Sequence, residues 1–201
     1  MIPTFIVVGV KAWERYTKPC LESIKKHMPE CEVVCVDNGS FYPDMDGVQM
    51  VRTDEVVCYA AGINAGLQGA YYNDWYLILN NDILIEKPFD IRHFEADNLY
   101  GFITYDFKSY KYLAGWGLFI PDNALDDIGY FDENLKPMWF EDADYCIRAQ
   151  KAGYGLVTLD RKAYGVRHFE DENMTERKAY MSKNMRQRRI NRQFIERKHD
   201  L

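Results

Sequence analysis

Trp75-Tyr-Leu-Ile-Leu-Asn-Asn-Asp82 is a run of bulky apolar residues that ends abruptly in three short polar ones. The apolar part, Trp75–Leu79, predicts a buried strand. Asn and Asp are common in the turns that follow strands, and a turn is sufficient to explain the tripeptide by itself. Asp82 is also placed to bind a hard cation, because magnesium needs only one or two protein carboxylates when substrate phosphates complete its shell.

Short apolar segments alternate with segments of helical spacing through the first half of the chain. We expect strands at Phe5–Val10, Glu32–Val36 and Val48–Arg52, and helices at Lys18–His27 and Ala60–Tyr72. This alternation indicates an α/β fold with a parallel sheet covered by helices. Ligands of such sheets bind beyond the carboxyl ends of the strands. Asp37 and Asp82 both follow strands, so the pattern predicts two carboxylates at one edge.

The second half of the chain is less regular, and no linker or internal repeat divides it. The expected elements are a Gly-containing strand, two helices, two short strands and a helical tail: Tyr112–Ile120, Pro121–Ile128, Glu141–Ala152, Leu156–Leu159, Tyr164–His168 and Met174–Lys198. A chain of 201 residues lies within the range of one domain. We expect this domain over residues 1–172, followed over residues 173–201 by a basic helical tail that packs on it or extends from it.

The net charge of −6 is unevenly distributed. Residues 176–201 hold nine Lys and Arg against three Asp and Glu, which leaves −12 for the rest of the chain. An acidic body argues against nucleic-acid binding and suits a site for a divalent cation. The tail either contacts an anionic surface such as a membrane, or packs on the body through Tyr180, Met181, Met185, Ile190 and Phe194.

The cysteines favour a reducing compartment. The chain has five of them without a CxxC pair, and three lie in or beside apolar runs: Cys31, Cys35 and Cys58. Buried thiols explain this pattern better than a disulfide framework or a zinc site. The run Phe5–Val10 is far shorter than the roughly 20 residues that span a bilayer, and it lacks the flanks of a signal peptide. We expect a cytoplasmic protein, with peripheral contact at the inner membrane face as the alternative.

Further candidate residues each have a structural explanation as well as a chemical one. Asp37 lies in the turn Asp37-Asn-Gly-Ser40 and can also bond a ribose or a base. Glu141 and Asp142 begin a helix, where carboxylates complement the helix dipole. Neighbouring helix positions diverge by about 100°, so one of the two could face a cleft as a general base. His168 ends a strand-like run, either as a structural histidine or as a metal ligand.

The order and spacing of these elements resemble the family 2 glycosyltransferases of the GT-A fold, and most closely their rhamnosyltransferase-like branch. The resemblance covers roughly residues 4–170. It is carried by seven segments: Val33-Val-Cys-Val-Asp37-Asn-Gly-Ser40, Gly62-Ile-Asn64-Ala-Gly66, Leu77-Ile-Leu-Asn80-Asn81-Asp82, Gly115-Trp-Gly117, Ile128-Gly-Tyr-Phe131-Asp132-Glu133, Phe140-Glu141-Asp142-Ala-Asp144 and Ala152-Gly153-Tyr154. It implies a GT-A (Rossmann-like) fold, with a mixed, mostly parallel central sheet flanked by helices and with a C-terminal helix.

The resemblance also implies roles for individual residues. Asn80-Asn81-Asp82 stands in place of the family's DxD motif, and Asp82 with His168 would hold Mn²⁺ or Mg²⁺. Glu141 and Asp142 match the family's acidic pair, in which the Asp is the usual general base. The nucleotide would be contacted by Val8, Lys11, Asp37, Asn64, Asn80 and Asn81. The donor sugar or the acceptor would be contacted by Gly115, Trp116, Gly117 and Trp139.

Two segments depart from the family pattern on the nucleotide side. Val56 and Cys58 occupy the places of an Asn-x-Gly, and Lys11-Ala-Trp13 follows the first strand where Tyr-Asn is common. Trp13 could stack on a base instead.

The implied activity is transfer of a sugar from a nucleotide diphosphate-sugar to an acceptor hydroxyl. The reaction would need a divalent cation and would invert the anomeric centre, with Asp142 as the base. The acceptor would be a saccharide, a lipid-linked sugar or a protein. Two alternatives stay open: a non-catalytic nucleotide-sugar-binding protein, and a nucleotidyltransferase, for which Val8-Gly-Val-Lys11 is a poor phosphate loop.

Overall fold

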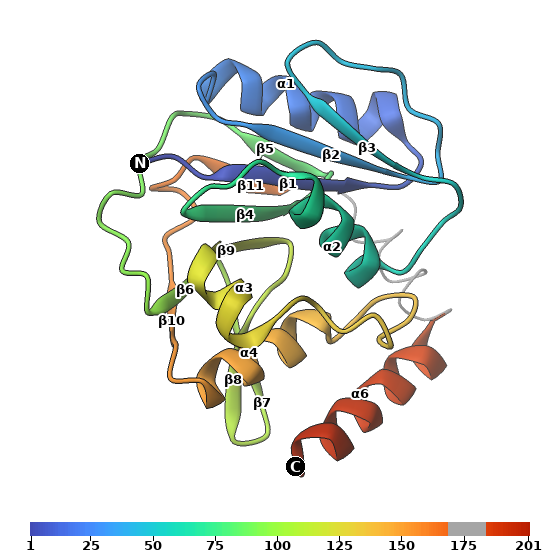
Figure 1. Ribbon diagram of the computed structural model, residues 1–201, viewed down its shortest axis with the longest axis vertical. Helices are drawn as coiled ribbons and strands as arrows, with labels where there is room; N and C mark the ends of the chain where they lie inside the picture. The colour runs from blue at the N-terminus through green and yellow to red at the C-terminus, as the bar shows by residue number, and fades with distance from the viewer. Residues whose placement is uncertain (169–183) are drawn as a thin grey trace.

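The computed structural model describes residues 1–168 and 184–201. Its centre is a seven-stranded sheet with the strand order β10-β6-β9-β4-β1-β2-β3 (Figure 1). Neighbouring strands pair in parallel except at β9, which runs antiparallel to both β4 and β6. The strands are β1 (Thr4–Gly9), β2 (Val33–Asn38), β3 (Gln49–Thr53), β4 (Trp75–Asn80), β6 (Asn98–Gly101), β9 (Gly117–Pro121) and β10 (Gly155–Thr158).

Two small sheets and several helices complete the fold. One small sheet pairs β5 (Ile83–Ile85) with β11 (Val166–His168), and the other is the hairpin of β7 (Thr104–Phe107) and β8 (Tyr110–Leu113). The helices are the π-helical turn η1 (Trp13–Thr17), α1 (Lys18–His27), α2 (Tyr59–Gly69), α3 (Asp122–Ile128), α4 (Glu141–Lys151) and α6 (Met185–His199). The predicted class, a mixed, mostly parallel sheet flanked by helices, is confirmed.

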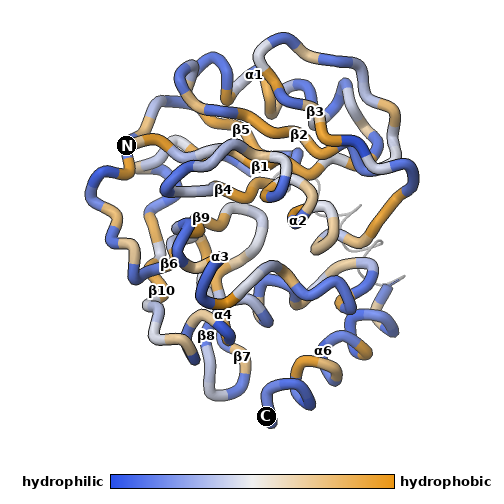
Figure 2. The backbone as a smooth tube through the Cα atoms, in the orientation of Figure 1, coloured by the Kyte–Doolittle hydropathy of each residue, from blue (hydrophilic) through white to orange (hydrophobic). Residues whose placement is uncertain are grey.

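The side chains of the central strands alternate between two cores. Phe5 and Val7 of β1 face α1, where they pack with Leu21 and Ile24. Ile6 and Val8 face the opposite side, where the core is closed by residues of α2, α3 and α4: Ala60, Ile63, Leu67, Ala124, Tyr145, Cys146 and Ala149. Figure 1 shows α1 on one side of the sheet and these three helices on the other. Figure 2 shows hydrophobic residues concentrated on the central strands. Burial on both faces explains why these strands are almost wholly apolar.

Helix α2 lies unusually close to the sheet because of its glycines. A Cβ on Gly62 would lie 2.8 Å from a methyl group of Val8, and one on Gly66 would overlap Ile6 and come within 2.9 Å of Val36. No larger side chain fits at these positions without moving the helix. The close approach brings Tyr59, the first residue of α2, toward the carboxyl end of β4.

The predicted strand Tyr112–Ile120 is wrong, because the segment forms two strands. β8 ends at Leu113 and β9 begins at Gly117. Between them the chain turns, and the amide of Gly117 points to the carbonyl of Ala114 at 3.5 Å. The sequence prediction also missed β5, β6 and β7, which are only three or four residues long.

The predicted tail helix is only partly described. Helix α6 begins at Met185, and residues 173–183, including Tyr180 and Met181, lie outside the described residues. Packing through Met185 and Ile190 is wrong, because they are 55% and 44% exposed. The helix instead buries Asn191, Ile195 and His199, with Phe194 partly buried. Within residues 1–168 and 184–201, no helix combines the length and apolarity needed to cross a bilayer.

Gly66→Val tests the contact between α2 and the sheet. The added side chain would push against Ile6 and Val36, and overpacking typically costs about 1–3 kcal/mol of unfolding free energy. Gln68→Val puts the same side chain on the exposed face of the same helix and should change stability much less. Urea denaturation of both variants measures the difference. Equal stabilities would contradict the close approach.

Candidate active site

Three parallel strands place polar groups at one edge of the sheet. β1 lies between β2 and β4, with Gly9 opposite Asp37 and Val8 opposite Asn80. The carboxyl ends of these strands therefore meet, as the sequence predicted for Asp37 and Asp82. Asp82 itself lies in the turn between β4 and β5.

Asp82 and His168 face one another across the small β5–β11 sheet. His168 is the partner of Ile83 in the strand register, so it lies beside the turn that carries Asp82. The Nε2 atom of His168 is 3.4 Å from Oδ1 of Asp82. The ring of Trp116 stacks on the imidazole, with ring centroids 5.0 Å apart. This stacking fixes the plane of the imidazole.

The pair fits a divalent cation that takes only part of its shell from the protein. Oδ1 of Asp82 is buried and accepts no hydrogen bond within the described part of the chain, and a buried oxygen of this kind normally has a partner. Carboxylate and imidazole are suitable ligands for Mn²⁺. Among the described residues, no cluster of three or more His, Cys, Asp or Glu side chains could hold a metal. Within this described part of the chain, Asp82 and His168 are two ligands of a shell that further groups, such as substrate oxygens or water, would complete.

Tyr59 joins this pair to the rest of the site. Its hydroxyl donates a 2.6 Å hydrogen bond to Oδ1 of Asn80. Burial raises the pKa of Tyr59 well above its usual range, and the nearby carboxylates of Glu141, Asp82 and Asp142 raise it further. These three carboxylates therefore all lie near one phenol. Sequence reasoning missed Tyr59, although it immediately precedes the small-residue helix that carries Gly62 and Gly66.

Glu141 and Asp142 begin α4, as predicted, and take different environments. Oδ2 of Asp142 accepts the backbone N–H of Gly115 at 2.9 Å, and Oδ1 accepts that of Ala143 at 2.8 Å. A Cβ on Gly115 would lie 3.0 Å from Cβ of Asp142, so a larger residue would displace the carboxylate. Glu141 is 7% exposed, and its Oε2 has no hydrogen-bond partner within the described residues.

The two environments favour different charge states. Burial, and next the charge of Asp142, raise the pKa of Glu141 to about 8. Burial also raises the pKa of Asp142, but the N–H groups of Gly115 and Ala143 oppose this by stabilising the ionised carboxylate. Glu141 is therefore the member of the pair that holds a proton more readily, and Asp142 the member that ionises more readily.

The predicted nucleotide contacts are dispersed along the edge. Asp37 is buried, and its two carboxylate oxygens accept the backbone N–H groups of Ser40 and Tyr42 at 2.9 and 2.7 Å. Asp37 thus stabilises the turn that follows β2, as one of the two sequence interpretations predicts. Its role in nucleotide binding stays a prediction. Lys11 is exposed, and its backbone bonds Oγ of Ser40 and the hydroxyl of Tyr42.

Three further predicted nucleotide residues use their side chains inside the protein. The amide of Asn64 is buried and bonds the backbone of Phe131 and the side chain of Glu133. This arrangement does not favour a role for Asn64 in nucleotide binding. Asn81 donates to Oγ1 of Thr17 at 2.8 Å. Val8 packs beneath α2.

The residues predicted to contact sugars lie on both sides of the site. Trp116 packs between Phe102 and His168, with centroids 5.5 and 5.0 Å away. Gly117 starts β9 directly above the ring of Phe102, which a Cβ would approach to 2.7 Å. Trp139 precedes α4 with φ of 78°. Trp13, considered for base stacking, packs on Tyr42 at 4.9 Å.

Glu141→Gln should flatten the dependence of stability on pH. The pKa of Glu141 is higher in the folded state than in the unfolded chain, so folding retains a proton that unfolding releases. Stability should therefore fall as pH rises from about 5 to about 8. Urea denaturation at several pH values measures this slope. Glu22→Gln, on the exposed side of α1, controls for the loss of one carboxyl. An unchanged slope in Glu141→Gln would contradict the assignment.

No protein-family model matches the chain, and no curated protein matches it. Solved structures do match. A mannosyltransferase from Pyrobaculum calidifontis, in complex with GDP-Man and Mn²⁺, aligns with a TM-score of 0.59 and 16% identity over 78% of this chain and 54% of that one. Residues 1–349 of S. aureus TarS, in complex with UDP, align with a TM-score of 0.60 and 18% identity over 81% of this chain and 59% of that one.

GalNAc-T7, with UDP, GalNAc and Mn²⁺, aligns with a TM-score of 0.64 and 11% identity over 78% of this chain and 42% of that one. The chain thus spans less than two thirds of each of these structures. At such identities the similarity concerns the fold. The chain has the GT-A fold that these glycosyltransferases share.

Proposed function

We propose that the protein transfers a sugar from a nucleotide diphosphate-sugar to an acceptor hydroxyl. One observation carries the proposal: Asp82, in the turn after β4, and the adjacent Glu141 and Asp142, at the start of α4, all lie near enough to the hydroxyl of Tyr59 to raise its pKa. Structural neighbours bound to GDP-Man, UDP and UDP-GlcNAc support the donor class. Membership of family 2, the rhamnosyltransferase-like branch and a hexosyl or deoxyhexosyl donor are parts of the proposal that rest on the sequence motifs.

Asp142 is the proposed general base. It is only partly buried, so an acceptor can reach it, whereas Glu141 is buried and holds a proton more readily. Pairs of carboxyl groups with separated pKa values commonly divide acid and base roles in this way. Asp142 would take the proton of the acceptor hydroxyl as that oxygen attacks the anomeric carbon. A single displacement without a protein nucleophile gives inversion.

Asp82 and His168 are the proposed protein ligands of a Mn²⁺ or Mg²⁺ ion. Such an ion would supply Lewis-acid stabilisation of a leaving diphosphate. Tyr59 would hold Asn80, and Trp116 would hold His168, in the geometry that this role requires. With Asp82 and His168 as its ligands from the described residues, the ion should bind weakly until a diphosphate adds its oxygens.

The acceptor is proposed to be a saccharide. Tyr105 and Tyr112 are partners on the β7–β8 hairpin, with ring centroids 5.4 Å apart, and Tyr105 is 44% exposed. Tyr112 lies near enough to Asp142 for that carboxylate to help raise its pKa, after burial. Apolar sugar faces stack on such rings. If the acceptor is instead lipid-linked, the basic outer face of α6 would contact the membrane that carries it. A cytoplasmic location stays a prediction.

Asp82→Ala should abolish the metal-dependent part of nucleotide affinity. Calorimetric titration of a nucleoside diphosphate with and without Mn²⁺ measures this part directly. Asp74→Ala removes an exposed carboxylate just before β4, at the opposite end of the strand, and should leave the Mn²⁺ effect intact. The same gain from Mn²⁺ in Asp82→Ala and in the unsubstituted protein would reject Asp82 as a ligand.

Asp142→Asn should lower sugar transfer by about 10²–10⁴-fold, the usual contribution of a general base. Nucleotide affinity should persist, because Asp82 and His168 are unchanged. A panel of nucleotide-sugars with Mn²⁺, followed by chromatography of the products, measures transfer and donor hydrolysis. Asp126→Asn, an exposed carboxyl on α3, is the matched control.

The same panel separates the alternatives. Binding of nucleotide-sugars without release or transfer of sugar by the unsubstituted protein would favour the non-catalytic binding protein. Incorporation of the nucleotide itself into a product would favour the nucleotidyltransferase. Full transfer by Asp142→Asn would leave the glycosyltransferase in place and remove Asp142 as its base.

A further inference from the structure

The backbone that leads into α4 is held in an unfavourable conformation. Trp139 and Phe140 have φ values of 78° and 71°, in the left-handed region that residues with a Cβ rarely occupy. Two such residues in succession persist only where surrounding contacts hold them. The helix has no side-chain hydrogen bond at its N-cap, Phe140, that would fix its first turn. Contacts from other elements hold this segment; one of them is the N–H of Tyr59, which donates to the carbonyl of Pro137 at 2.9 Å.

Asn191 of α6 supplies three further contacts to this segment. Its side chain is 2% exposed, and its Nδ2 donates to the carbonyls of Lys136, Met138 and Trp139 at 3.1, 2.9 and 3.2 Å. Its Oδ1 accepts the side-chain amide of Gln187 at 3.0 Å. The three carbonyls require a donor and Gln187 requires an acceptor, so these contacts determine which way the Asn191 amide is oriented. Removing this donor would leave the three carbonyls without the hydrogen bonds that hold the segment in place.

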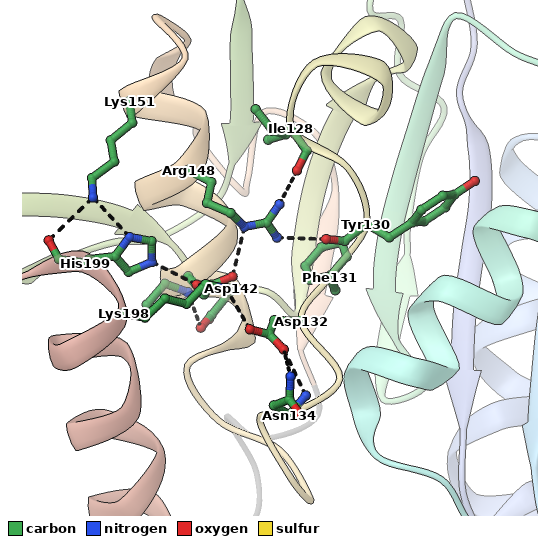
Figure 3. Close-up of polar contacts among 12 residues, drawn as sticks. Ile128, Tyr130, Phe131, Asp132, Asn134, Asp142, Arg148, Lys151, Lys198 and His199 are labelled. Carbon is green, nitrogen blue, oxygen red and sulfur yellow. Dashed lines mark hydrogen bonds and ion pairs between the residues drawn. The ribbon is translucent and has the colours of Figure 1, made fainter.

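A second contact ties α6 to the first turns of α4. Asp144 is fully buried, and its carboxylate accepts Arg148 at 2.9 Å from its own helix and Lys198 and His199, both at 2.8 Å, from α6. Figure 3 shows Arg148, Lys198 and His199 converging beside Asp142 and Asp132. Ile195 of α6 is also fully buried, in the cluster that includes Phe140. Helix α6 thus holds α4 just before and just after Glu141 and Asp142.

We propose that Asn191 is a positioning residue for the Asp142 carboxylate, acting through the backbone of residues 136–140. The inference rests on the proposed function, since it assigns a role within that site. Within the described residues, the hydrogen bonds of Asn191 outside α6 all go to the segment that precedes α4. The residues proposed to bind nucleotide and metal lie elsewhere, on β1, β2, α2, β4 and β11 or in the turns after β1 and β4. Loss of the three Asn191 hydrogen bonds should therefore misplace the base and leave donor binding unchanged. A shift of about 1 Å in such a group can reduce turnover by about 10²-fold.

Asn191→Asp is the sharpest test, because it keeps the size of the side chain and turns a donor into an acceptor. The new carboxylate would face three carbonyls and repel them. We expect kcat to fall by about 10–100-fold, with the KM for the donor and the Kd for nucleotide within twofold of the unsubstituted protein. Gln193→Glu makes the same chemical change on the exposed side of α6 and should keep full turnover.

Amide hydrogen exchange gives a readout that does not depend on sugar transfer. The N–H of Gly115 is protected through its bond to Asp142, so it should exchange faster in Asn191→Asp, while amides of β1 keep their protection. Asn191→Ser is the milder variant if Asn191→Asp does not fold; its short hydroxyl cannot serve all three carbonyls. Gly115 protection equal to the unsubstituted protein in a folded variant would overturn the proposal.

Two other outcomes are also decisive. Parallel loss of protection at Gly115 and in β1 would show a general role in stability and would overturn a positioning role. Faster exchange at Gly115 alone, in a protein that transfers no sugar to any acceptor, would support the positioning of Asp142 while rejecting the proposed function.

Discussion

The pairing of β1 with β2 on one side and β4 on the other is the constraint on which the rest of the structure depends. It aligns three carboxyl ends, so that Asp37 and the Asn80–Asp82 turn share an edge. The pairing is stabilised by burial on both faces, since alternate residues of β1 enter different cores. The glycines of α2 then allow Tyr59 to reach Asn80. A polar site is thus assembled on strands whose own side chains are almost entirely apolar.

The other half of the site depends on a helix start that has no cap of its own. Helix α4 obtains its position from Gly115 in front and from α6 behind. The same confinement separates the two carboxyl groups electrostatically, because Asp142 receives N–H donors and Glu141 does not receive a partner for Oε2 within the described residues. The packing around residues 136–144 therefore determines both where the carboxyl groups of Glu141 and Asp142 lie and which of them ionises more readily. The basic α6 contributes to this packing with Asn191, Ile195 and His199, whereas its apolar residues Met185 and Ile190 face outward.

Local sequence patterns were sufficient to predict those elements whose conformation depends mainly on their own residues. Helix α1 has the predicted bounds, and the strands before Asp37 and Asp82 differ from their predictions by one or two residues. Elements that depend on distant partners were not predictable in this way. The three residues of β5 form a strand only because β11 pairs with them, and the Gly115 turn splits the predicted strand because the chain approaches Asp142 there. Tyr59 and Asn191 carry no motif, and their importance comes from what other segments bring to them.

The pairing of β5 with β11 has a consequence for how the protein folds. Glu86, directly after β5, and Arg167, within β11, are 81 residues apart in sequence and form an ion pair at 2.7 Å. Closing so long a loop is entropically unfavourable until the intervening sheet and helices have formed. During synthesis, β1, β2 and β4 can pair long before His168 leaves the ribosome. The edge of the sheet is therefore assembled early, while Asp82 and His168 meet late, so the proposed cation site would be completed only after the strands β1, β2 and β4 beside it have paired.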